Sequence, residues 1–358
     1  MSTRTLWCVT AAFCIFSSFG FAQQISPKPL ITQPVLNSDL TTLRGNTHPL
    51  AQRQFDIGAA SPDMPMNRML LVLKRSPGQE RALQAMLDNQ QDKLSPQYHK
   101  WLTPDQFGAQ FGPTDQDLQT VTAWLQSYGF QINRVSRGRS VVEFSGVESQ
   151  VEAAFHTSIH KYLVNGEEHW ANASDPQIPT ALVPAVAGVW SLHNFFKKPN
   201  IQIAPEKISA KYTPGKLPDT NLSDGSHALS PADYATIYNI NPVYNGGNSG
   251  GGAIAIVARS NLFNSGEDVR DFWQVFGVAG ASLQIINDGP DPGDLGGNEE
   301  FEATLDASWS GAVATGAVID FVLSASTNTT DGVDLSELYI IDNNLASVMT
   351  ESFGSCTR

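Results

Sequence analysis

The sequence predicts two architectures in succession, an α+β front half and then an α/β portion built on a mostly parallel sheet. In the front half, predicted helices and strands interleave over roughly 130 residues without strict alternation. From residue 231 onward, apolar strands alternate with helices, which is typical of a doubly wound parallel sheet. The length of 358 residues suits about two domains, and 41% hydrophobic residues suffice for their cores.

The front-half elements follow from hydrophobic periodicity and turn residues. Strands are predicted at residues 68–74, 131–135, 140–144 and 158–164, and the segment 178–189 closes the unit. Predicted helices contain Leu83, Met86 and Leu87, then Val121, Trp124, Leu125 and Tyr128 before Gly129, and then residues 147–155. This order suits a small α+β sandwich of the ferredoxin-like kind.

The back half opens on a buried strand at residues 253–258, after a glycine-rich loop. The loop precedes a strand and does not link a strand to a helix, which argues against a phosphate-binding loop. Further elements are predicted at residues 268–276, 283–286, 299–312, 318–324, 335–343 and 347–352, as helix, strand, helix, strand, helix and strand. About 125 residues remain for this sheet, which is short for a doubly wound domain.

The N-terminus is predicted to be a secretory signal at residues 1–22, because Arg4 precedes an apolar run at residues 6–21. An uncleaved membrane anchor is the alternative. Residues 23–66 are rich in Pro, Gln, Ser and Thr and are predicted to be poorly ordered. The predicted domains are 67–196 and 231–358, and residues 197–230 form a Lys- and Pro-rich linker with a processing site. We therefore expect a secreted, extracellular protein.

The charge is divided unevenly between the halves. The net charge is −13, which argues against a nucleic-acid binder. From Ala228 onward there are 17 acidic residues against Arg259, Arg270 and Arg358, whereas residues 1–227 hold 18 acidic and 19 basic residues. The acidic half indicates either simple solubility or function at low pH, where the repulsion fades.

The predicted helix at residues 299–312 contains the best candidates for chemistry. Glu302 and Asp306 lie one turn apart, at the edge of an apolar stripe formed by Phe301, Leu305, Trp309 and Ala312. The helix dipole favours acids in the first turn but does not explain Asp306. Two partly buried carboxylates would raise the pKa of one of them, as a general base and acid requires. The alternative is a pair of ordinary solvated acids.

Other catalytic arrangements are less well supported. No histidine follows His227, so the back half cannot supply a Ser–His–Asp triad. The i,i+4 pair His156 and His160 crosses a predicted change from helix to strand, so we expect no metal site there. If Cys8 and Cys14 leave with the signal, Cys356 is a lone thiol and makes neither a disulfide framework nor a zinc site.

Several motifs together resemble the sedolisins, the serine-carboxyl peptidases that include kumamolisin. The helix EATLDASWSGAVA (302–314) resembles the Glu-x-x-x-Asp helix of that family, and VMTESFG (348–354) resembles its strand toward the substrate cleft. The front half resembles the pro-kumamolisin activation domain through SPQYHKWLTP (95–104), FSG (144–146), AFHT (154–157) and IP (178–179). The resemblance implies a subtilisin-like α/β peptidase domain in which Glu302 is the general base and Asp306 orients it.

The chain also departs from the family pattern. It contains no Gly-Thr-Ser tripeptide, in which the family places its nucleophile, and Ala258-Arg259 stands where some relatives have a further glutamate. Ser308, Ser310 and Ser352 lack the context of the family nucleophile. We therefore expect a precursor that ends within its peptidase domain, without the serine and without the C-terminal calcium site that the family implies. No other cofactor is expected.

Two functions remain open from the sequence. The first is a secreted, acid-acting endopeptidase precursor, predicted to be monomeric, with protein or peptide substrates and an intramolecular contact between prodomain and catalytic domain. Low pH would loosen that contact, and the enzyme would cut its own linker. The second is a non-catalytic product that inhibits a complete relative or helps it to fold. The coding sequence after Arg358 would separate them, since only the first requires a Gly-Thr-Ser segment there.

Overall fold

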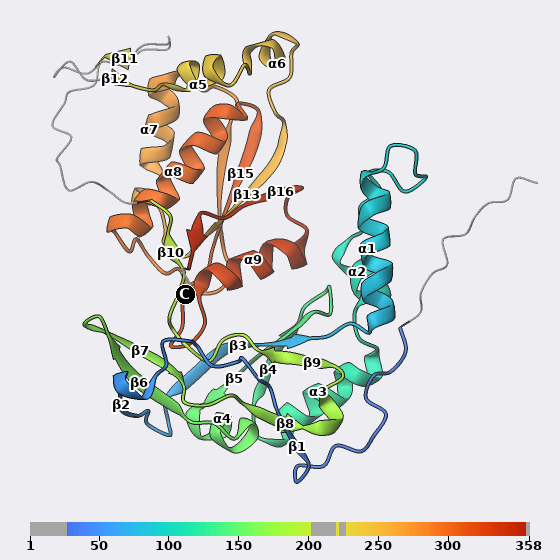
Figure 1. Ribbon diagram of the computed structural model, residues 1–358. Helices are drawn as coiled ribbons and strands as arrows, with labels where there is room; N and C mark the ends of the chain where they lie inside the picture. Colours follow the sequence, from blue (N-terminus) through green and yellow to red (C-terminus); the bar gives the residue numbers. More distant parts are fainter. Residues whose placement is uncertain (1–26, 202–219, 222–226, 356–358) are drawn as a thin grey trace, which may run out of the picture.

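The computed structural model describes residues 27–201, 220–221 and 227–355. Two parts lie one above the other in Figure 1, joined by the segment around β10 (Lys198–Pro199). Helix α9 (Gly332–Asn343) lies between the parallel sheet of the upper part and the antiparallel sheet of the lower part. The predicted signal at residues 1–22 lies outside the described residues, among which no helix is long and apolar enough to span a membrane.

The lower part is an antiparallel sheet covered by helices. Its main sheet has the order β4-β5-β3-β9. Its elements are β1 (Leu40–Thr42), β2 (Asp56–Ala59), β3 (Pro65–Leu73), α1 (Pro77–Gln91), α2 (Pro104–Phe111), α3 (Asp115–Ser127), β4 (Gln131–Val135), β5 (Val141–Val147), α4 (Glu148–Phe155), β6 (Ile159–Val164), β7 (Glu167–Asn172), β8 (Gln177–Pro179) and β9 (Val186–Val189). The connections of β3, α3, β4, β5, α4 and β9 are compatible with the expected β-α-β-β-α-β order.

Local sequence explains where these helices begin. Ser76, Thr103 and Thr114 each accept a hydrogen bond from a backbone N–H in the first helical turn, and the residue at that turn bonds back to complete a capping box. Helix α2 is absent from the sequence prediction. The core of this part lies between the sheet and α3 and α4, with Trp124, Phe144 and Phe155 in edge-to-face or tilted contact.

The prediction that residues 23–66 are poorly ordered is wrong from residue 27 onward. Ile31 and Leu43 belong to the buried core, and β1 pairs with β8 while β2 pairs with β6. The Asp117 carboxylate accepts the backbone N–H groups of Leu30 and Ile31 at 2.8–3.1 Å. The polar, Pro-rich composition of residues 23–66 indicated only that no helix forms there. Its strands are ordered by partners more than 100 residues away in the chain, which periodicity cannot reveal.

The upper part is a parallel sheet with helices on both faces, as expected. The order is β14-β15-β13-β16, and each neighbouring pair is parallel. Its elements are β11 (Thr220–Asn221), β12 (His227–Ala228), α5 (Pro231–Ile237), α6 (Asn241–Asn245), β13 (Gly252–Ala258), α7 (Glu267–Phe276), β14 (Ser282–Asn287), α8 (Gly297–Val313), β15 (Ala317–Leu323), α9, β16 (Val348–Thr350) and β17 (Phe353–Gly354). The subtilisin-like assignment stays a prediction.

Strand β13 is buried on both faces of the sheet, which explains why its sequence is continuously apolar. Ala255 and Val257 pack toward α9, whereas Ile256 and Ala258 pack toward α7 and α8. A strand buried on both faces of a parallel sheet needs apolar side chains at every position.

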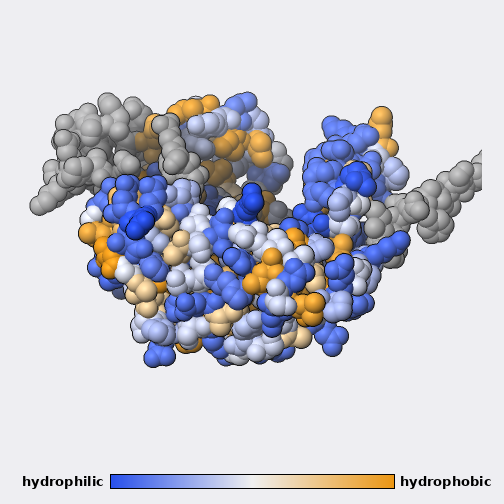
Figure 2. Space-filling view, turned by 60° about the horizontal axis from the view of Figure 1, so that its bottom comes forward, coloured by the Kyte–Doolittle hydropathy of each residue, from blue (hydrophilic) through white to orange (hydrophobic). Residues whose placement is uncertain are grey.

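Arginine residues of the lower part contact acidic residues of the upper part. Arg68 Nη2 lies 2.6 Å from Asp288 Oδ2, and the Arg137 backbone N–H donates to Asp342 Oδ1 at 3.0 Å. Figure 2 shows the opposite, outer face of the lower part as mostly hydrophilic, with hydrophobic residues in small separate groups. The charged contacts therefore mark the face that meets the upper part.

Candidate active site

Helix α8 buries a face of small residues against the sheet and α7. Its buried residues are Glu302, Ala303, Ala307, Ser308, Gly311 and Ala312. The predicted stripe is therefore wrong for Phe301, which is 45% exposed. A side chain on Gly311 would collide with the ring of Trp273, whose Nε1 donates to the Ser308 carbonyl at 2.9 Å. Small residues allow this close approach of helix to helix, and hydrophobicity alone did not reveal the buried face.

Glu302 lies on that buried face and not at its edge. Only 3% of the residue is exposed. Its Oε2 accepts the backbone N–H of Ile201 at 2.7 Å. A buried carboxylate requires hydrogen-bond donors to offset its lost hydration. The donor to Glu302 comes from the segment that links the two parts of the chain.

Asp306 lies one turn further along α8 and is partly buried. The Ser352 hydroxyl donates to Asp306 Oδ1 at 2.9 Å. Burial raises the pKa of Asp306 to about 6; the hydrogen bond from Ser352 opposes this rise and the charge of Glu302 adds to it. A carboxyl group with this pKa exchanges its proton in mildly acidic solution, which is the property that the sequence predicted for one member of the pair.

This raised pKa predicts a pH-dependent effect of the substitution Asp306→Asn. The folded protein takes up a proton near pH 6, and the unfolded chain does so only near the ordinary value of 3.8. The cost of burying the charge is thus present in full above the folded pKa and decreases as the pH falls from there to the unfolded pKa. We expect Asp306→Asn to be more stable than the wild type at about pH 7.5, and this advantage to shrink as the pH falls below about 6 and to vanish only below the unfolded pKa of 3.8.

Urea unfolding at several pH values would measure this difference. Asp291→Asn, in an exposed loop, is the control and should show no such trend. A stability difference that does not change with pH would contradict the assignment.

The segment from Lys198 to Ile201 lies along the strand that follows β16. Lys198 pairs with Gly354 and Pro199 with Phe353 in antiparallel register. The Asn200 N–H donates to the Ser352 carbonyl at 2.9 Å. Residues 198–200 of the predicted linker are therefore held by backbone partners at residues 352–354; residues 202–219 and 222–226 lie outside the described residues. Such strand addition is a general way to hold an extended peptide.

The sequence did not reveal that Arg259 contacts two carboxylates and a backbone carbonyl at once. This residue follows β13 directly and is only 7% exposed. Its guanidinium contacts Glu299 Oε1 at 2.6 Å and Asp331 Oδ1 at 2.9 Å, and Nη2 also donates to the Lys197 carbonyl at 2.7 Å. Burial alone would lower the pKa of Arg259, but the hydrogen bonds and charges of these two carboxylates outweigh it and raise the pKa. Its position at the carboxyl end of a parallel strand was the available signal.

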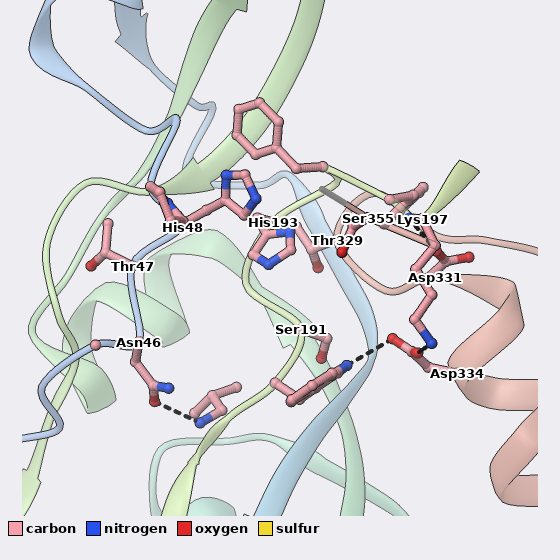
Figure 3. Close-up of a pocket in the computed structure, with 16 residues that line it drawn as sticks. Asn46, Thr47, His48, Ser191, His193, Lys197, Thr329, Asp331, Asp334 and Ser355 are labelled. Atoms are coloured by element: carbon pink, nitrogen blue, oxygen red, sulfur yellow. Dashed lines mark hydrogen bonds and ion pairs between the residues drawn. The ribbon is translucent and has the colours of Figure 1, made fainter. Parts of the chain in front are cut away.

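Lys197 lies beside a pocket between the two parts of the chain. The pocket holds about 320 Å³, and Figure 3 shows His48, His193 and Lys197 along its wall with Asp331 and Asp334. The indole N–H of Trp190 donates to Asp334 Oδ2 at 2.8 Å. Burial, with the charges of His48 and His169, lowers the pKa of His193 to about 4, so this imidazole stays neutral in mildly acidic solution.

The remaining candidates do not form a site. His156 ends α4, and His160 Nδ1 lies 2.8 Å from Asp56 Oδ2. Within the described ranges, no group of three or more His, Cys, Asp or Glu side chains is arranged to hold a metal. Ser308 is buried on α8, whereas Ser352 is brought to Asp306 by the fold. Cys356 lies outside the described residues.

Comparison with known proteins agrees with the two-part organisation. Residues 53–195 match the family described as "Pro-kumamolisin, activation domain". The chain is 28% identical over 267 residues to sedolisin of Pseudomonas sp. (strain 101), a match that covers 73% of this chain and 43% of sedolisin. It is 26% identical over 310 residues to xanthomonalisin of Xanthomonas sp. (strain T-22), covering 83% of this chain and 36% of xanthomonalisin. The matched region is thus less than half the length of either relative.

Proposed function

Because this chain is a sedolisin-family precursor with a pro-kumamolisin activation domain, we propose that it gives rise to a secreted serine-carboxyl endopeptidase that acts in acid. The observation that carries the proposal is the contact between Glu302 Oε2 and the Ile201 N–H, at 2.7 Å. A buried carboxylate here meets the backbone of an extended segment that pairs with β17 as a peptide substrate would.

In this proposal Glu302 is the general base and Asp306 orients it. Glu302 takes the proton of a serine hydroxyl as its oxygen attacks the peptide carbonyl, and then delivers that proton to the departing nitrogen. A carboxylate base keeps its function at a pH where imidazole would be protonated. The full-length product of the gene should therefore cleave peptides between about pH 3 and pH 5. Activity confined to neutral pH would contradict the proposal.

The activation domain is proposed to keep the site closed until acidification. The Arg68–Asp288 and Lys197–Glu351 pairs join the two parts at 2.6 and 2.9 Å. Protonation of such carboxylates removes the attraction and leaves a positively charged activation domain free to separate. Calcium binding stays a prediction from the family resemblance.

We predict that the first bond cut in the precursor is Asn200–Ile201. The general base must reach the nitrogen that departs, and the nitrogen next to Glu302 Oε2 is that of Ile201. Incubation of the full-length gene product at about pH 4 should yield a new N-terminus at Ile201, detected by mass spectrometry.

The same experiment has a control and a clear contrary result. Glu302→Gln should leave the precursor uncut under identical conditions. Failure of the unaltered protein to be cut anywhere between residues 197 and 231 would contradict self-processing, and a cut elsewhere in that range would contradict the assigned bond.

A further inference from the structure

The carboxylates around the Lys197 ammonium outnumber it. Lys197 Nζ lies 3.0 Å from Asp334 Oδ1 and 2.9 Å from Glu351 Oε1. The pKa of Glu337 depends on the same charged groups. Burial raises this pKa, the charges of Glu351 and Asp334 raise it further, and the charge of Lys197 lowers it. Among the described residues, Lys197 is the only base ion-paired with Asp334 or Glu351. Without that lysine, Asp334 and Glu351 would have no ion-paired base among the described residues.

The backbone of Lys197 is held independently of its side chain. Its N–H donates to Asp331 Oδ2 at 3.1 Å, and its carbonyl accepts from Arg259 Nη2 at 2.7 Å. Asp331 and Arg259 are 4% and 7% exposed, so both are built into the upper part of the chain. These contacts use groups that every peptide residue has. These backbone contacts would hold any residue at this position. The neighbouring carboxylates favour a positively charged side chain there.

The position is set relative to the candidate catalytic base. Lys197 precedes Ile201 by four residues, and the residues between them run antiparallel to residues 352–354. An extended peptide bound in the same register would place one side chain between Asp334 and Glu351 when the amide nitrogen four residues later lies beside Glu302.

We propose that Asp334 and Glu351 form a specificity subsite that binds a lysine or arginine side chain of the peptide substrate. The residue bound there is the fourth on the N-terminal side of the cleaved bond, and Lys197 occupies the subsite in the precursor. This inference rests on the proposed peptidase function. The alternative is that the pocket only anchors Lys197 and has no role once the activation domain has left.

Peptides copied from residues 195–203 test the subsite. The position of Lys197 is filled with lysine, arginine, norleucine or glutamate, and kcat/KM is measured with the acid-processed full-length gene product at about pH 5. Lysine and arginine peptides should be cleaved about tenfold more efficiently than the norleucine peptide, and the glutamate peptide least. The double variant Asp334→Asn, Glu351→Gln should bring the lysine-to-norleucine ratio close to one. Equal rates for the lysine and norleucine peptides, or an unchanged ratio in the double variant, would overturn the subsite.

Hydrogen exchange of the precursor separates failure of the subsite from failure of the peptidase function. If no peptide is cleaved, the proposed function fails, and the subsite is judged from the uncut chain. Lys197→Met should speed exchange of the Asn200 and Ile201 amides about tenfold. Lys198→Met is the matched control, because that neighbouring side chain is 75% exposed and its ion pair with Glu167, at 3.6 Å, is long. Unchanged exchange in Lys197→Met would overturn recognition of the lysine by the pocket.

Discussion

Replacing Glu302 with glutamine is expected to lower kcat for peptide cleavage by about 10²–10⁴-fold, the usual contribution of a general base. The amide has the same shape and its oxygen still accepts the Ile201 N–H, but it cannot take a proton from a serine. The measurement is cleavage of a fluorogenic peptide at acid pH by the full-length gene product.

Stability measurements separate a chemical effect from misfolding. Glu302→Gln removes a buried charge, so urea unfolding should show equal or greater stability than in the wild type. Glu300→Gln, two residues earlier on α8, is the matched control and should retain activity within about twofold. An active Glu302→Gln enzyme would remove Glu302 from the mechanism.

Replacing Arg259 with methionine is expected to destabilise the folded chain by about 3–5 kcal/mol, the usual cost of removing one partner of a buried ion pair. The substitution leaves Glu299 and the buried Asp331 without their cation and removes the donor to the Lys197 carbonyl. Urea unfolding at neutral pH measures the loss. Since burial raises the pKa of Asp331, the penalty should shrink in acid as this carboxyl group becomes protonated.

Arg270→Met provides the comparison for Arg259. Arg270 is an exposed arginine of α7 whose guanidinium donates to the Ser265 carbonyl. It should change the free energy of unfolding by no more than about 0.5 kcal/mol. Equal effects of the two substitutions would mean that the ion pairs of Arg259 contribute little to stability.

Local patterns predicted most elements of the parallel sheet. The continuous apolar run of β13 and the largely apolar run of β15, which contains Asp320, lie close to their predicted positions, because strands buried on both faces of a parallel sheet are mostly apolar. The antiparallel part was harder. Strands β1 and β2 are short and mostly exposed, and they are strands because β8 and β6 lie beside them. No local propensity contains that information.

The face of α8 shows the same limit at the candidate site. Hydrophobicity pointed to Phe301, whereas packing against Trp273 selected the small residues and turned Glu302 inward. The i,i+4 spacing of Glu302 and Asp306 was evident from the sequence. How deeply each carboxylate is buried was not, because burial depends on which helix approaches and how closely.

The sequence by itself determined the chemical groups available: a Glu-x-x-x-Asp helix, an acidic back half and no histidine after His227. Tertiary structure alone decided what those groups meet. Glu302 receives a donor 101 residues away and Asp306 one 46 residues away. Arg259 donates hydrogen bonds to Asp331 and Glu299, which lie 72 and 40 positions away in the chain. Spacing along a helix is set by local geometry, whereas the hydrogen bonds and pKa values of buried carboxylates depend on neighbours that only the fold brings together.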